Sequence, residues 1–145
     1  MRLHTACLLV ALGLALVLAT GVYAAEVAAP RFPQSQITKA QFNAYLAEVQ
    51  KMSDTLCRDD LPNEFICSSG SQQSIWVFTR PGHPAHPAVS RGVVIKVVAS
   101  GQKVRIERSG HYAGSAKGFE AWMTDLAQRD ARKLSAKGRE ERDDT

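Results

Sequence analysis

The stretch that decides the fold is SIWVFTRPGHPAHPAVSRGVVIKVV, residues 74–98, in which a proline-rich loop separates two strand patterns. Residues 74–80 are rich in β-branched and aromatic side chains, which favour strands. Residues 88–98 include the run VVIKVV, which is apolar on both faces near its centre. A third pattern, KVRIER at residues 103–108, alternates between charged and apolar side chains. The intervening residues 99–102 predict a turn, so we expect the last two strands to form a hairpin.

One helix pattern precedes these strands and another follows them. Thr38 and Gln41 have the spacing of a capping box, and the apolar residues that follow recur at helical spacing: Phe42, Tyr45, Leu46, Val49, Met52 and Leu56. A second helix is predicted from about residue 116 to about residue 136, with Ser115 as its cap and Gly138 as its stop. Its apolar face consists of Phe119, Trp122, Met123, Leu126 and Leu134.

Together these patterns predict an α+β fold. The simplest packing is a small two-layer domain, with both helices on one face of an antiparallel sheet. Three strands are expected between the helices, in the order helix–strand–strand–strand–helix. Residues 65–68 can add a short fourth strand, so the sheet should have three to four strands.

The beginning of the chain has the order of a secretory signal peptide. Arg2 supplies the initial charge, residues 6–20 are an apolar run, and small residues precede Ala25. Residues 1–24 are therefore expected to be removed on export, and the rest contains no segment apolar for long enough to span a membrane. The remaining chain divides into a flexible leader at 25–36, a single α+β domain at 37–136 and a charged, disordered tail at 137–145.

Export also decides how the cysteines are interpreted. Cys7 lies inside the signal peptide, which leaves Cys57 and Cys67 as an even pair in an oxidising compartment. We expect them to form a disulfide that ties the edge of the first helix to the start of the sheet. The residues between them, with Pro62, predict a turn, and closing so short a loop stabilises the fold by about 2–3 kcal/mol.

The loop between the first two strands holds His83 and His86, and hairpin geometry places His111 at the same end of the sheet, opposite about Ser90. Neutral imidazoles at these three positions could bind zinc or copper. However, Pro84 makes local chelation awkward, and no carboxylate or cysteine stands near to complete a ligand set. The alternative is that the histidines shape a rigid loop.

Charge is concentrated in the same half of the chain. The whole chain has a formal charge of +4, whereas residues 71–118 contain seven basic residues and one acidic residue, which gives 7 − 1 = +6. Such a surface can attract an acidic partner. The predicted partner-binding residues are His83, His86, Arg91, Arg105, Arg108 and His111. Ser115 and Lys117, at the start of the second helix, are weaker candidates for an anion site.

A resemblance bears on the compartment. The run SIWVFTRPGHPAHPAV, followed by a basic strand, HYAGS and a Phe-x-x-Trp helix, resembles small exported proteins of proteobacteria with a strand–PGHPAHP–strand arrangement. The likeness covers roughly residues 65–135. It implies a Gram-negative periplasm, and it brings no activity or catalytic residues with it.

These observations predict a small, non-enzymatic periplasmic protein that recognises a protein or an acidic ligand through the His/Pro loop and a basic sheet edge. One version is an immunity-type inhibitor of a toxin, and nucleic acid is excluded as a partner by export. The alternative is a metal-binding protein that uses the loop histidines. A hydrolase is less favoured, because Ser90 and Ser115 lie in no GxSxG sequence and no acid is placed to orient a histidine base.

Overall fold

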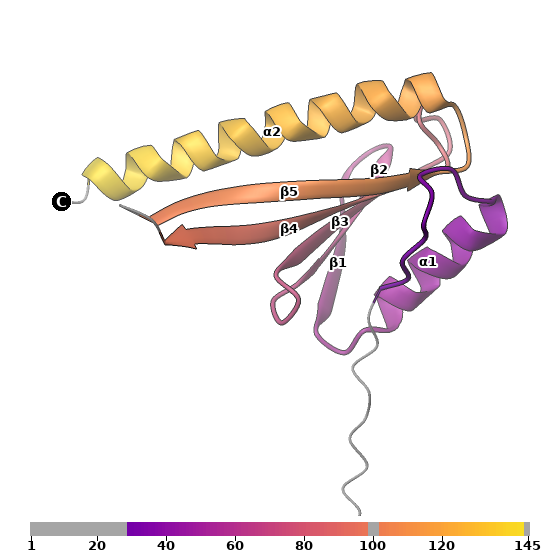
Figure 1. The fold of residues 1–145 in the computed structure, drawn as a ribbon, viewed down its shortest axis with the longest axis horizontal. Helices are drawn as coiled ribbons and strands as arrows, with labels where there is room; N and C mark the ends of the chain where they lie inside the picture. Colours follow the sequence, from indigo (N-terminus) through magenta and orange to yellow (C-terminus); the bar gives the residue numbers. More distant parts are fainter. Residues whose placement is uncertain (1–28, 99–101, 144–145) are drawn as a thin grey trace, which may run out of the picture.

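The computed structural model describes residues 29–98 and 102–143 and confirms the α+β class (Figure 1). The elements follow in the order α1 (Lys39–Lys51), β1 (Thr55–Leu61), β2 (Glu64–Ser69), β3 (Ser74–Thr79), β4 (Ala88–Val98), β5 (Gln102–Tyr112) and α2 (Ala116–Asp143). Each strand pairs antiparallel with its neighbour in the chain, which gives one sheet in the order β1-β2-β3-β4-β5. The sheet thus has five strands, one more than the upper end of the expected range of three to four. The predicted signal peptide and hairpin tip lie outside the described residues.

The additional strand, β1, corrects the interpretation of the segment after α1. Helix α1 ends at Lys51, so Leu56 and Cys57 belong to a strand, and the Leu56 side chain is 78% exposed. Cys57 lies directly opposite Cys67 in the β1–β2 register, and the two form the predicted disulfide. The bridge therefore ties β1 to β2, and the expected link between helix and sheet is wrong.

The helices cover opposite faces of the sheet, so the domain has three layers instead of two (Figure 1). One core joins α1 to the sheet face that carries Cys67, Trp76, Phe78 and Val89. The other joins α2 to the opposite face, with Val77 between Trp76 and Phe78 in the sequence. Side chains alternate between the two faces of a strand, and five of the six residues of β3 are buried. A strand that is apolar on both faces needs a layer on each side.

The β4–β5 hairpin forms as predicted, with a register one residue from the expected one. Val98 pairs with Gln102, and His111 pairs with Val89 instead of Ser90. A shift of one residue changes the face, and His111 therefore lies on the α1 face, together with Val89. None of the helices in the described part of the chain combines the length and apolar character that a membrane crossing requires.

Both ends of the predicted domain extend further than expected. Ala29 and Ile37 are buried in the α1 core, and Tyr112 exchanges backbone hydrogen bonds with Ser35 and Ile37, so residues 29–36 are packed instead of forming a flexible leader. At the other end, α2 continues past Gly138 to Asp143. Lys, Arg and Glu are good helix formers, and residues 137–143 therefore extend the helix instead of forming a disordered tail.

Candidate functional site

The His/Pro loop, residues 80–87, is a folded structure at the end of β3. The backbone N–H of His83 donates to Arg80 O at 3.0 Å, and that of His86 donates to His83 O at 2.9 Å. Ala85, between the histidines, is fully buried, and its N–H donates to His83 Nδ1 at 3.1 Å. The loop thus directs His83 toward α2 and His86 toward α1, as their separate partners show.

The start of α2 packs directly on this loop. A Cβ atom on Gly114 would lie 2.4 Å from His86 O, and one on Gly118 would lie 2.4 Å from Pro84 O. Both glycines are therefore explained by close backbone packing. Ser115 Oγ accepts the backbone N–H of Gly118 at 3.1 Å, which confirms the predicted cap. Lys117, the other residue of the predicted anion site, is exposed.

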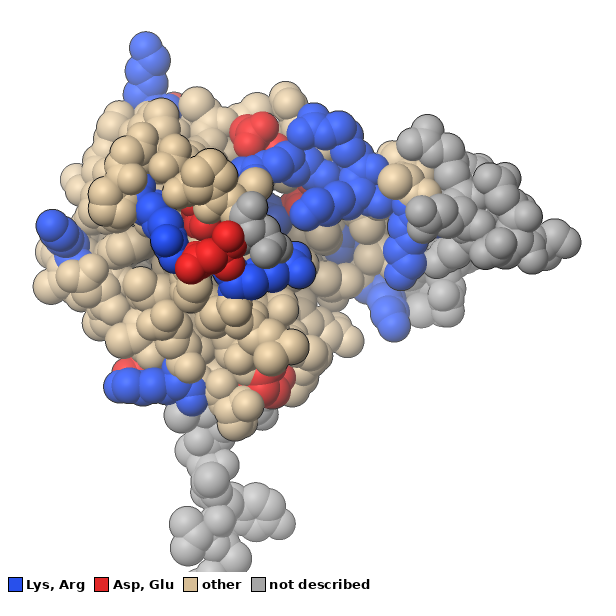
Figure 2. All heavy atoms as spheres, turned by 180° about the vertical axis from the view of Figure 1, so that it is seen from behind, with Lys and Arg blue, Asp and Glu red and all other residues tan. Residues whose placement is uncertain are grey.

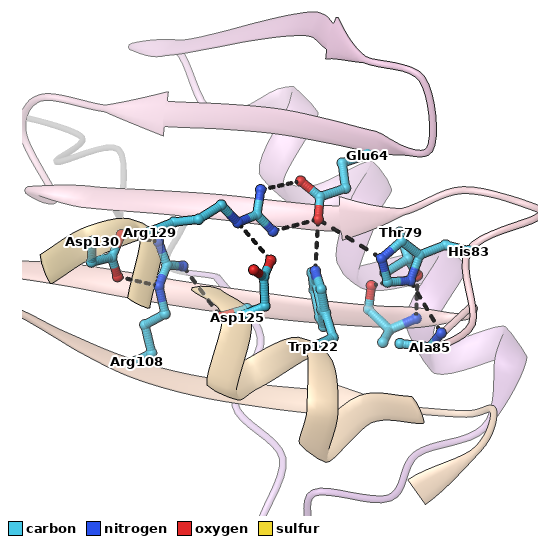
Figure 3. Close-up of polar contacts among 11 residues, drawn as sticks. Glu64, Thr79, His83, Ala85, Arg108, Trp122, Asp125, Arg129 and Asp130 are labelled. Atoms are coloured by element: carbon cyan, nitrogen blue, oxygen red, sulfur yellow. Dashed lines mark hydrogen bonds and ion pairs between the residues drawn. The ribbon is translucent and has the colours of Figure 1, made fainter. Parts of the chain in front are cut away.

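On the α2 side, Glu64 is the centre of a buried polar network (Figure 3). Its Oε1 accepts hydrogen bonds from Trp122 Nε1 at 2.7 Å and from Arg129 Nη2 at 2.7 Å, and its Oε2 accepts one from Arg129 Nη1 at 2.8 Å. His83 packs edge-on against Trp122, and its Nε2 lies 3.9 Å from Glu64 Oε1. The network joins β2, the loop and α2.

The electrostatics of the network stabilise an ionised Glu64 and a neutral His83. Burial alone raises the pKa of the Glu64 carboxyl group, but the hydrogen bonds from Arg129 and Trp122 outweigh it, so the pKa is lowered. Burial lowers the pKa of His83, against the opposing effect of Glu64 and with the help of Arg129. A carboxylate that accepts hydrogen bonds from three donors fixes the positions of the Trp122 and Arg129 side chains, and it is poorly suited to taking up a proton.

These shifts predict that acid destabilises the fold in two stages. His83 takes up a proton near pH 6.5 when unfolded and resists it when folded, so the free energy of unfolding falls as the pH drops below about 6.5. The stability that ionised Glu64 contributes is lost further down, as the pH falls through its lowered pKa. Urea denaturation between pH 7.5 and 5.5 should show the first stage, and His83→Gln should flatten it. An unfolding free energy that rises on acidification would contradict this.

On the α1 side, His86 borders a groove of about 400 Å³ between α1 and the end of the sheet. His86 Nδ1 lies 2.9 Å from Thr79 O, which can only accept, so Nδ1 carries the hydrogen. The imidazole ring also packs edge-on against Phe42, at 5.8 Å between ring centres. The groove is lined by Lys39, Phe42, Asn43, Leu46, Gln50, Phe65, Phe78, Thr79, Arg80, Pro81 and His86.

The wall of this α1 groove is mainly apolar. Aromatic and aliphatic side chains form most of its wall, and the charged residues that line it, Lys39 and Arg80, are both basic. The Arg80 guanidinium lies 5.4 Å above the Phe65 ring and pairs with Asp59 outside the groove. A pocket of a few hundred Å³ with apolar walls and few polar groups is typical of small-ligand sites.

The third histidine lies elsewhere. His111 packs edge-on against Phe32, at 5.3 Å between ring centres, and its Nδ1 donates to Gln34 O at 2.9 Å. His83, His86 and His111 thus have three separate sets of partners. Within residues 29–98 and 102–143, no group of three or more His, Cys, Asp or Glu side chains is placed to hold a metal ion.

Two of the three predicted arginines have internal partners. Arg91 donates to Ser74 Oγ and lies over the Trp76 ring, while Arg108 forms two hydrogen bonds to Asp130 at 2.5 and 2.9 Å and a third to Ser90 Oγ. The side chains of Arg108 and Asp130 are only 9% and 10% exposed. Arg105 is different, since its side chain is 61% exposed and pairs with Glu107. The predicted partner-binding set therefore does not form one surface.

The sequence interpretation also missed basic residues of α2 and β1. Arg58, Arg129 and Lys133 line a small hollow of about 80 Å³ between α2 and the sheet. Seen from behind, the molecule shows one larger group of Lys and Arg side chains at the upper right, and other basic side chains are scattered over the rest of this face (Figure 2). For the α1 groove, the sequence does contain a signal. Three separate elements each contribute a phenylalanine to its lining, namely Phe42, Phe65 and Phe78.

Comparison with known proteins adds no family to this description. No family model matches the chain, and neither a curated protein nor a solved structure matches it.

Proposed function

We propose that the chain is an exported, non-enzymatic binding protein, and that the α1 groove holds a ligand with an apolar body and an anionic group. The observation that carries the proposal is the lining of the groove. Its apolar wall would bury the body of the ligand, while Lys39 and Arg80 are the only charged residues among those that line it. Removal of apolar surface from water contributes roughly 25 cal/mol per Å², and the basic rim favours a carboxylate or sulfonate.

The same chemistry can come from two sources in the periplasm. A free amphipathic carboxylate is one, and the C-terminal aromatic residue of a partner protein, which has both a ring and a carboxylate, is the other. An immunity-type inhibitor would correspond to the second source. The two serines considered as nucleophiles of a hydrolase do not support that alternative, because Ser90 is buried beside Arg108 and Ser115 caps α2.

The proposal predicts that the fluorescent probe 8-anilinonaphthalene-1-sulfonate binds the native protein at a site that Asn43→Trp blocks. Asn43 is an exposed α1 residue that lines the groove, so the larger ring should fill it and raise the Kd at least about tenfold, which corresponds to about 1.4 kcal/mol. Ala44→Trp is the matched control, because Ala44 is also exposed on α1 and lies outside the lining. Fluorescence titration measures both.

Competition then separates the two sources. Displacement of the probe by dodecanoate, and not by dodecanol, indicates a free amphipathic anion. Displacement by the peptide Gly-Gly-Phe, and not by its C-terminal amide, indicates a partner's chain end. Lys39→Glu should weaken probe binding more than Lys51→Glu, which lies at the other end of α1. Equal affinity of Asn43→Trp, Ala44→Trp and the unchanged protein would refute the proposal.

A further inference from the structure

The outer edge of β5 is available for pairing over most of its length. Strand β5 is the last of the sheet, and among residues 29–98 and 102–143 the one bridge on its outer side joins Gln36 to Tyr112. Tyr112 N–H donates to Ser35 O, and Tyr112 O accepts from Ile37 N–H, at 2.8 Å each. Both backbone groups of Tyr112 therefore point away from β4, toward the outer side of the sheet. Backbone groups alternate in direction along a strand, so those of Gly110, Arg108, Ile106 and Val104 also point outward.

A groove of about 420 Å³ runs beside this edge, between β5 and α2. It is lined by Arg105, Ile106, Arg108, Met123, Ala127, Asp130, Ala131 and Leu134. Ala127 and Ala131 are small, so they leave space next to the strand, and Met123 and Leu134 provide apolar walls. Figure 1 shows α2 running along the hairpin above β5, so the α2 groove and the strand edge are parallel. An added strand would place every second side chain in this groove.

We propose that an extended acidic segment of a partner protein pairs with β5 as a sixth strand, with alternate side chains in the α2 groove. Addition of a strand gains affinity from main-chain hydrogen bonds and specificity from pockets for alternate side chains. The chain already uses this edge in the same way, since residues 35–37 pair with its C-terminal end.

The charge of the β5 edge favours an acidic segment over a second copy of the chain. The β5 sequence contains Lys103, Arg105 and Arg108 against Glu107, and Asp130 of α2 pairs with Arg108, so the edge and this partner together have a charge of 3 − 2 = +1. A second copy of the chain would place two such strands side by side, and like charges on neighbouring strands are destabilising. Charged residues on an edge strand protect it from pairing with itself, and toward an acidic segment the same residues become attractive.

The test uses a fluorescein-labelled peptide of ten residues that alternates valine and glutamate. Anisotropy titration at low salt is expected to show binding that Ala131→Trp, which fills the α2 groove, weakens at least tenfold. Ala121→Trp is the matched control on an exposed α2 position outside the groove and should leave the Kd unchanged. A peptide with N-methyl groups on the alternate residues whose N–H groups would face β5 should lose binding, because it cannot donate to the outward C=O groups of that strand.

Three results of the titrations would overturn the proposal: no binding of the peptide to the unchanged protein, equal Kd values for Ala131→Trp and Ala121→Trp, or equal binding of a valine–lysine peptide. Size-exclusion chromatography with light scattering tests whether a second copy of the chain occupies the edge instead. A dimer that Ala131→Trp dissociates would show that a second copy occupies the edge, and would also overturn it. Binding of the anilinonaphthalene probe reports on the α1 groove, on the opposite face of the sheet, so failure of either proposal is seen separately.

Discussion

Glu64→Ala is expected to lower the free energy of unfolding by about 3–5 kcal/mol, the range for removal of one partner from a buried ion pair. The Glu64 side chain is 7% exposed and that of Arg129 is 25% exposed. Without Glu64, two guanidinium hydrogen bonds and the indole N–H of Trp122 lose their acceptor. An unsatisfied buried polar group costs its full desolvation energy, so the lower part of the range applies if water reaches Arg129.

Two further variants test the explanation by urea denaturation. Asp125 also pairs with Arg129, but its side chain is 54% exposed, so Asp125→Ala should cost no more than about 1 kcal/mol. The double variant Glu64→Leu/Arg129→Met removes both charges and should recover much of the lost free energy of unfolding. Replacing both partners of a buried ion pair by apolar residues costs less than leaving one charge without its partner. A loss below 1 kcal/mol in Glu64→Ala would show that the network does not anchor α2.

The elements that the sequence predicts well are those with strong local signals. The β4–β5 hairpin has a long apolar run and an alternating strand around a turn, and the capping box of α1 is present with both hydrogen bonds, between Thr38 and Gln41. The disulfide is expected because the interpretation of Cys7 as part of a signal peptide leaves an even pair of cysteines. In each case a few neighbouring residues carry the information, so no knowledge of tertiary packing is needed.

Strand β1 and the layer arrangement depend on partners that are distant in the sequence. The β1 sequence, TLCRDDL, is mostly polar because the strand lies at an edge of the sheet. Leu56 happens to continue the four-residue spacing from Met52, which favours a helix. The sequence did contain a signal for the three-layer arrangement, since residues 75–78 are apolar on both faces, and such a strand is expected between two layers.

The candidate site could be predicted only in part, for a related reason. Sequence spacing places His83 and His86 in one loop, but the folded backbone sends them to opposite sides, one toward Trp122 and the other toward Phe42. Arg108 looks like a surface residue of a basic strand, whereas its partner, Asp130, stands 22 positions later on α2. Pairings of this kind leave no local pattern in a single sequence.

Gly118→Ala should destabilise the fold by about 1–3 kcal/mol, the usual range for overpacking. In an ordinary helix the same change gains up to about 1 kcal/mol, because alanine has the better helix propensity. Here the new Cβ would lie 2.4 Å from Pro84 O and 2.9 Å from its carbonyl carbon, both of which are backbone atoms. The helix or the loop must therefore shift, and the sign of the effect reverses.

The same steric argument applies to Gly114 and predicts a functional consequence. Gly114→Ala would place its Cβ 2.4 Å from His86 O, so relief of the clash moves the residue that borders the α1 groove. We expect both variants to lower the midpoint of thermal unfolding and to weaken binding of the anilinonaphthalene probe. Gly70→Ala is the control, since a Cβ there meets no atom within 4 Å. Because the predicted sign is opposite to that of helix propensity, a rise in the unfolding midpoint of Gly118→Ala would refute tight packing of α2 on the His/Pro loop.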